Sequence, residues 1–168
     1  MFASFIFGSA VLPEIKPLLV DFLGSLTPEL NQKSGSLNSS PVNSIQPEQL
    51  SPLALAYIGD AVYELYVRSQ LLLPPKRISQ YHSQVVNRVR AETQAAYLCA
   101  IEADLTPEEK DIVRRGRNAV SHKPKRLSPK VYQQATSLEA LIGYLYLTDR
   151  SRLQELLAQS HLHTEPNA

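Results

Sequence analysis

Two carboxylates stand in apolar surroundings, where they could hold a divalent cation. Asp60 lies within the apolar run 53–65, and Glu139 is the only charged residue between Lys130 and Asp149. An isolated carboxylate among apolar side chains either destabilises the fold or takes up a proton. Magnesium prefers oxygen ligands and is typically held by one or two carboxylates together with waters and substrate phosphates. We therefore expect the two acids to share a magnesium ion.

A structural role for each acid is the alternative. Either acid could cap a helix, pair with an arginine from another segment, or lie at an exposed helix edge. A single acid in an apolar helix usually has such a role, whereas two of them in two apolar helices of one small domain favour a shared metal. Glu64 follows Asp60 by one helical turn, and it is a candidate to support the metal site from its outer side.

Helices are expected to position these acids. Apolar residues recur with helical spacing around both of them, which predicts helices over 50–71 and 128–148. Both segments are apolar nearly all round, so we expect them inside the core. Gly59 and Gly143 would let the two helices approach closely. Further helices are predicted over 76–102 (in one or two pieces), 106–116 and 150–160. Because no strand pattern is evident, the predicted fold class is all-α, a helical bundle.

Domain boundaries follow from composition. Residues 31–49 are rich in Ser, Asn, Gln and Pro and cannot bury enough apolar surface to offset ordering, so they should form a flexible linker. Ahead of them, apolar residues over 15–23 have the spacing of a short amphipathic helix that could dock on the main domain or on a partner. We expect an N-terminal extension over 1–46, one folded domain over 47–160 and a tail over 161–168.

Overall composition excludes several classes. The chain has 17 Lys and Arg against 16 Asp and Glu, so its net charge of +1 indicates no particular partner. The single cysteine, Cys99, cannot form an internal disulfide, which fits a reducing compartment. No basic residue precedes the short apolar run at the N-terminus, and no segment approaches the ~20 apolar residues that span a bilayer. We expect a soluble, cytoplasmic protein with no membrane partner.

Charge is nevertheless segregated along the chain. Residues 114–130 hold seven Lys or Arg and no acid, whereas residues 102–111 hold five acids and one lysine. We interpret the basic segment as a loop that contacts the phosphates of a nucleic acid, and a solvated charged loop is the alternative. The candidate contacts are Arg114, Arg115, Arg117, Asn118, Lys123 and Lys125. Acids that bind a metal, together with a basic segment that binds the backbone, indicate a metal-dependent phosphodiesterase acting on a polynucleotide.

Two motifs and the basic segment resemble a known family. The run LALAYIGDAVYEL resembles the signature helix of the ribonuclease III family, and SLEALIGYLYLTD resembles that family's second acidic motif. With the segment RRGRNA, the chain is similar to the mini-ribonuclease III branch over roughly 46–150. The matching positions are Asp60 and Glu139, which the resemblance implies are catalytic and metal-binding.

This resemblance implies an all-α endonuclease domain that dimerises. It implies Mg²⁺-dependent cleavage of double-stranded RNA to give 5′-phosphate and 3′-hydroxyl ends. In the mini branch the implied task is maturation of precursor large-subunit ribosomal RNA during ribosome biogenesis. A-form RNA would then be recognised by its shape and its 2′-hydroxyls.

The chain also departs from the wider family. Ala56 and Thr136 stand where that family carries two further carboxylates, so waters or RNA phosphates would have to complete the metal's ligands. Only about eighteen residues follow Arg150, too few for the double-stranded-RNA-binding domain that usually comes next. We therefore expect salt-sensitive RNA binding, assisted by a ribosomal protein or by a structured substrate.

Two other functions stay open at this point. A catalytically inactive, ribonuclease III-like protein that binds RNA or the ribosome would explain Ala56 and Thr136, but such a protein would gain stability by replacing both acids. A helical protein-interaction module would use tyrosines as interface anchors, although core tyrosines with hydrogen-bonded hydroxyls are more common. The tyrosines concerned are Tyr57, Tyr63, Tyr66, Tyr144 and Tyr146.

Overall fold

The computed structural model describes residues 46–120 and 126–159, and within these ranges every regular element is a helix. The elements are η1 (Pro47–Gln49), α2 (Pro52–Leu71), α3 (Ile78–Val89), α4 (Ala91–Ile101), η2 (Glu102–Asp104), α5 (Pro107–Ala119), α6 (Pro129–Thr148) and α7 (Arg150–Gln159). The predicted all-α fold is confirmed, and the segment 76–102, which was expected to be helical in one or two pieces, forms two helices, α3 and α4. The amphipathic helix expected over 15–23 lies outside the described residues.

Local capping residues define where the long helices begin. Ser51 accepts a hydrogen bond from the Ala54 amide at 3.1 Å, and proline follows it at the first helical position. Ser128 caps α6 in the same way. These side chains accept bonds from amides that the first helical turn leaves without partners, so short-range chemistry sets these boundaries.

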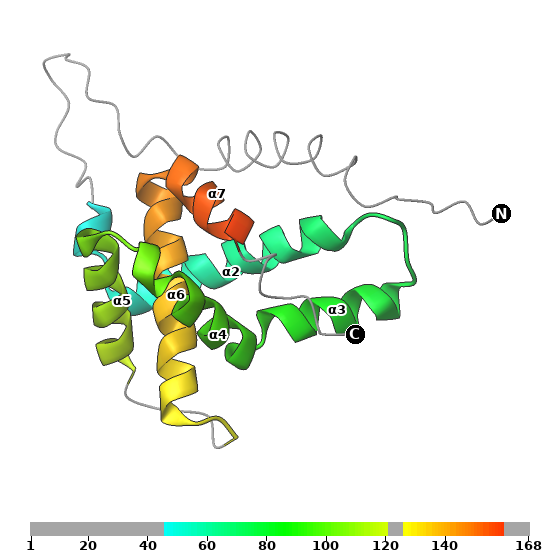
Figure 1. Cartoon of the computed structure of the whole chain (residues 1–168), viewed down its shortest axis with the longest axis horizontal. Helices are drawn as coiled ribbons and strands as arrows, with labels where there is room; N and C mark the ends of the chain where they lie inside the picture. The colour runs from blue at the N-terminus through cyan, green and yellow to red at the C-terminus, as the bar shows by residue number, and fades with distance from the viewer. Residues whose placement is uncertain (1–45, 121–125, 160–168) are drawn as a thin grey trace, which may run out of the picture.

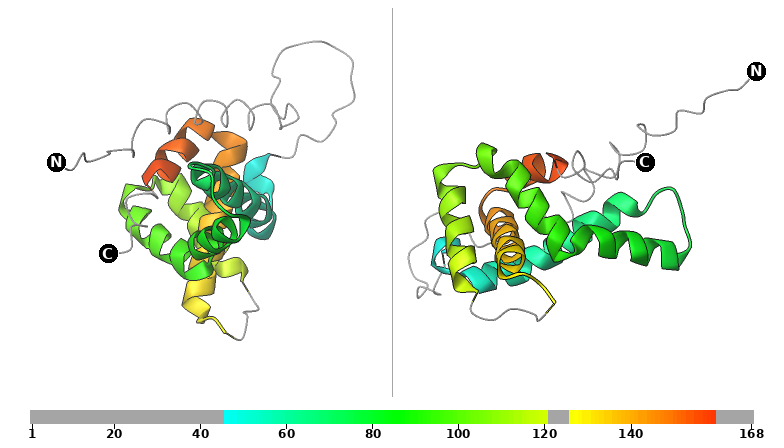
Figure 2. Two further views of the ribbon diagram at one scale, coloured as in Figure 1. Left: turned by 90° about the vertical axis from the view of Figure 1, so that its right-hand side faces the viewer. Right: turned by 60° about the horizontal axis from the view of Figure 1, so that its bottom comes forward.

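Helix α6 forms the centre of the bundle. It contacts α2, α4, α5 and α7, and Figures 1 and 2 show these helices arranged around it. Its residues Leu138, Ala140 and Leu141 are almost completely buried. A helix that is apolar on every side needs neighbours on every side, which is the environment predicted for this segment.

Helices α2 and α6 cross with their backbones in contact. A Cβ atom added to Gly59 would lie 1.8 Å from the carbonyl oxygen of Glu139. One added to Gly143 would lie 2.0 Å from the carbonyl oxygen of Leu55. No side chain larger than hydrogen fits at either position, so the predicted role of both glycines in close helix approach is confirmed.

Helix α2 is not buried on all sides, which corrects the expectation that it lies wholly inside the core. Leu55 and Tyr63 are buried, whereas Leu53 is 53% exposed and Tyr57 is 84% exposed. The helices packed on α2 are α6, α3 and α5, and none of them covers the face that carries Leu53 and Tyr57. In Figures 1 and 2, α3 and the second half of α2 project together from the bundle.

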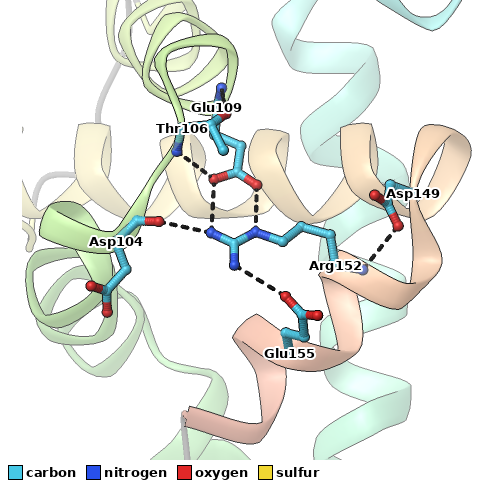
Figure 3. A network of polar contacts seen from close by, with 6 residues as sticks. All are labelled: Asp104, Thr106, Glu109, Asp149, Arg152 and Glu155. Atoms are coloured by element: carbon cyan, nitrogen blue, oxygen red, sulfur yellow. Dashed lines mark hydrogen bonds and ion pairs between the residues drawn. The ribbon is translucent and has the colours of Figure 1, made fainter.

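An ion pair joins α7 to the start of α5 (Figure 3). The Arg152 guanidinium donates to both carboxylate oxygens of Glu109, at 2.9 and 3.2 Å, and to the carbonyl oxygen of Asp104 at 2.8 Å. Glu109 also accepts from the Thr106 amide at 2.8 Å as part of a capping box. Only 4% of the Glu109 side chain is exposed, so its charge depends on these donors.

Within the part of the chain that the structure describes, no helix is long and apolar enough to cross a membrane.

Candidate active site

The crossing of α2 and α6 brings the two predicted acids together. Asp60 follows Gly59 directly, and Glu139 is the residue whose backbone touches Gly59. The carboxylates are close enough for the charge of Asp60 to act on Glu139. Asp60 is exposed, whereas Glu139 is partly buried. The site therefore has one solvent-facing acid and one that lies deeper between the helices.

Electrostatics make this pair costly in its ionised form. Burial and the charge of Asp60 raise the pKa of Glu139 to about 7, although the side-chain amide of Gln94 opposes the shift. Burial and the charge of Glu64 raise the pKa of Asp60 above its usual value. Two carboxylates that resist ionisation attract a cation, because a nearby positive charge removes both the repulsion and part of the desolvation cost.

Glu64 lies beside the pair and is engaged with another side chain. Its carboxylate accepts a hydrogen bond from Arg68 at 2.6 Å, and both side chains are well exposed. Its charge still contributes to the raised pKa of Asp60. The structure thus places Glu64 near Asp60, with an arginine as its direct partner.

The donors at the site suit a cation that keeps most of its water. Among residues 46–120 and 126–159, no three His, Cys, Asp or Glu side chains gather closely enough to enclose a metal. Ala56 and Thr136 are buried, at 6% and 5% exposure, and bring no charge to the crossing. Two carboxylates fit Mg²⁺, which retains waters and takes further oxygens from substrate phosphates. They do not fit a structural zinc site, which takes four protein ligands.

Gln94 of α4 is a neighbour of the site that sequence reasoning missed. Its side chain is 2% exposed, and its Nε2 donates to the carbonyl oxygen of Val89 at 2.9 Å. The same amide lies within hydrogen-bonding reach of the Glu139 carboxylate. Nothing in the run AETQAAYL distinguishes a buried glutamine from the exposed glutamines common on helices, because its burial comes from the packing of α4 on α6.

The predicted RNA-contacting residues divide into three groups. Arg114, Arg117 and Asn118 are exposed on α5, where Arg114 pairs with Asp111 at 2.5 Å. Arg115 is partly buried, and it donates to the carbonyl oxygen of Leu50 at 3.0 Å. Lys123 and Lys125 lie outside the described residues. The first part of the basic segment is therefore helical and not a loop, because Gly116 lets α5 pack closely against Ser137 of α6.

Comparison with known proteins agrees with this geometry. Residues 53–150, which include both acid-bearing helices, match the Ribonuclease III domain family. The chain belongs to the ribonuclease III family.

Relatives in this family include proteins named Mini-ribonuclease 3. The one from Thermosynechococcus vestitus is 53% identical over 123 residues, which cover 72% of this chain and 82% of the relative. The one from Synechocystis is 54% identical over 123 residues, covering 73% and 85%. A crystal structure of a Fusobacterium nucleatum protein matches with a TM-score of 0.61 at 32% identity, covering 67% of this chain and 89% of that one. These matches confirm the predicted branch and support the interpretation as an endoribonuclease.

Most of the tyrosines of this ribonuclease III domain are not surface anchors. Tyr63, Tyr66 and Tyr146 are buried, and the Tyr66 hydroxyl donates to the carbonyl oxygen of Leu157 at 3.0 Å. Tyr144 is partly buried. The three buried tyrosines have the core role that the sequence favoured over the alternative of an interaction module, and Tyr57 is the one of the five that is exposed.

Proposed function

We propose that this protein is a Mg²⁺-dependent endoribonuclease that cleaves double-stranded regions of RNA. Asp60 and Glu139 act as its catalytic and metal-binding residues. The observation that carries the proposal is the meeting of these two acids at the crossing of Gly59 and Gly143. The two helices that cross there are the two that match the motifs of the ribonuclease III family.

Each residue at the crossing has a distinct part in the reaction. Bound Mg²⁺ would activate water and offset the charge that develops at the phosphodiester. Asp60, which faces solvent, would bind the metal where RNA can reach it, and the more buried Glu139 would hold it from the protein side. The glycine contacts fix the distance between the helices, so the carboxylates need little reorganisation when the metal arrives.

The working form is proposed to be a homodimer. Tyr57 and Leu53 leave an apolar face of α2 exposed, and Tyr57 precedes Asp60 by about one helical turn. Aromatic side chains that are exposed in the single chain are typical of the centre of protein interfaces. A second copy of the chain that covers this face would lie beside the active site, and the two sites of the dimer would flank one RNA duplex.

RNA binding is proposed to use the exposed cations at the end of α5. Arg114, Arg117 and Asn118 lie there, and Lys123 and Lys125 follow them in the sequence. The proposed substrate is precursor large-subunit ribosomal RNA, processed in the cytoplasm, with a ribosomal protein or the folded RNA assisting recognition. The domain limits proposed for this activity are 47–160, with an extension before them and a short tail after them.

Cleavage assays test the proposal directly. A structured ribosomal RNA precursor and a plain RNA duplex are incubated with the protein, in Mg²⁺ or in EDTA. Asp60→Asn and Glu139→Gln should each abolish Mg²⁺-dependent cuts. Glu108→Gln, which neutralises an exposed acid at the start of α5, should cleave like the parent. Cleavage by Asp60→Asn at the parental rate would refute the assignment.

A second candidate is supported by the small number of carboxylates. Because Ala56 and Thr136 bring no charge to the site, an RNA- or ribosome-binding protein without catalysis is the alternative. In the same assay, that alternative predicts equal RNA binding by the parent and by Asp60→Asn, and no cuts by either.

A further inference from the structure

Gln94 places a polar amide in the buried interior beside the active site. Its side chain is 2% exposed, and its neighbours on α4, Ala95 and Leu98, are buried apolar residues. Its Oε1 atom is buried without a hydrogen-bond partner. A buried acceptor left unpaired destabilises a fold, so packing alone does not account for an amide at this position.

The Gln94 amide has one partner at the end of α3 and a second neighbour, Glu139, at the site. Nε2 donates to the carbonyl oxygen of Val89 at 2.9 Å, at the end of α3. This nitrogen carries two hydrogens, so a second acceptor can be served at the same time. Glu139 lies within hydrogen-bonding reach of the same side chain, because α4 packs on α6. The position of the amide is thus set by α3 and α4, and its second N–H is left for an acceptor on the neighbouring helix α6.

We propose that Gln94 is a positioning residue that orients the Glu139 carboxylate toward Asp60. This inference rests on the proposed metal-dependent cleavage and deepens it. The charge of Asp60 repels the ionised Glu139 carboxylate, and the amide of Gln94 is the neighbour that favours it. A neutral donor fixes a carboxylate without competing for the cation, which is how hydrogen bonds to metal ligands usually act.

The test replaces Gln94 with an apolar side chain of similar volume, which removes the amide. Gln94→Met is compared with Gln134→Met, a matched control on α6 whose amide donates to Cys99 Sγ at 3.0 Å. Calorimetry with MgCl₂ measures metal binding without RNA, and single-turnover cleavage of an RNA duplex is measured over a range of MgCl₂ concentrations. Loss of a hydrogen bond to a metal ligand typically costs about 10–100-fold in metal affinity or activity. We expect that loss for Gln94→Met, with unchanged KM for RNA, and values within twofold of the parent for Gln134→Met.

The outcomes separate this inference from the proposed function. If the parent cleaves, Asp60→Asn does not, and Gln94→Met matches the parent in metal binding and rate, the role of Gln94 is refuted and the nuclease stands. If the folded parent neither binds Mg²⁺ nor cleaves RNA, the proposed function fails and this inference fails with it.

A measurement on the unmodified protein decides the case in which Gln94→Met does not fold. The side-chain amide signals of Gln94 and Gln134 are followed by nitrogen-15 NMR while MgCl₂ is added. We expect the Gln94 signal to shift and the Gln134 signal to stay in place. If the chemical shift of the Gln94 amide did not change when the metal bound, the proposal would be overturned.

Discussion

Replacing Gly59 with alanine should force the two acid-bearing helices apart. The added Cβ would lie 1.8 Å from the Glu139 carbonyl oxygen, whereas ordinary contact begins at 3.4 Å. The difference between these distances, about 1.6 Å, is the separation that the helices must gain, because a backbone oxygen in a packed interior cannot rotate away. The substitution therefore tests directly whether the crossing sets the geometry of the site.

The expected losses differ in size for stability and for activity. Alanine improves an isolated helix by about 1 kcal/mol relative to glycine, but overpacking a core costs about 1–3 kcal/mol and sometimes more. We expect Gly59→Ala to lower the free energy of unfolding by about 2 kcal/mol. A misplacement of about 1 Å can cost 100-fold in rate, so cleavage per folded molecule should fall about 100-fold. Urea denaturation followed by circular dichroism and single-turnover cleavage measure the two effects.

Gly116→Ala is the matched control. Its added Cβ would lie 2.9 Å from the Ser137 Cα, at the crossing of α5 and α6. This contact needs a shift of only about half an ångström, so we expect a smaller loss of stability and cleavage within several-fold of the parent. If Gly59→Ala were as stable as the parent and cleaved RNA as fast, the close crossing would not determine the site.

Three further predictions follow from other parts of the structure. Arg152→Met should lower the free energy of unfolding by about 3 kcal/mol, because Glu109 stays buried without its cation. Although burial raises the pKa of Glu109, hydrogen bonds from Arg152 and Thr106 hold it below its usual value, so this stabilisation is complete at neutral pH and disappears as pH falls through the folded-state pKa. Urea titrations should show the parent and the variant converging below about pH 4, and a constant difference would contradict the assignment. Replacing Tyr57 with serine should shift a dimer toward monomer in analytical ultracentrifugation, and an unchanged dimer would exclude this face. Neutralising Arg114 and Arg117 together, with Arg115 retained, should reduce the salt slope of RNA binding by about 2, and an unchanged slope would remove them from the interface.

The sequence alone was enough to predict the helices and to single out the two acids, because both predictions depend on patterns among neighbouring residues. Helical spacing of apolar residues, and caps such as Ser51 and Ser128, depend on neighbours within a few positions. Asp60 and Glu139 stood out because a charge in an apolar run is unusual whatever the rest of the chain does. The two segments that carry these acids resemble motifs of the ribonuclease III family in the same order along the chain, and this resemblance predicted the function.

Tertiary structure decided what depends on residues far apart in the chain. Only packing could show that Gly59 meets Glu139, that Gln94 is buried beside the site, and that Tyr57 is left exposed. Arg115 likewise belongs to the fold through its bond to Leu50, although the sequence grouped it with the RNA-binding arginines. Burial is a property of the neighbours that a segment acquires on folding, so a helix that is apolar on all sides does not reveal which of its faces the chain will cover.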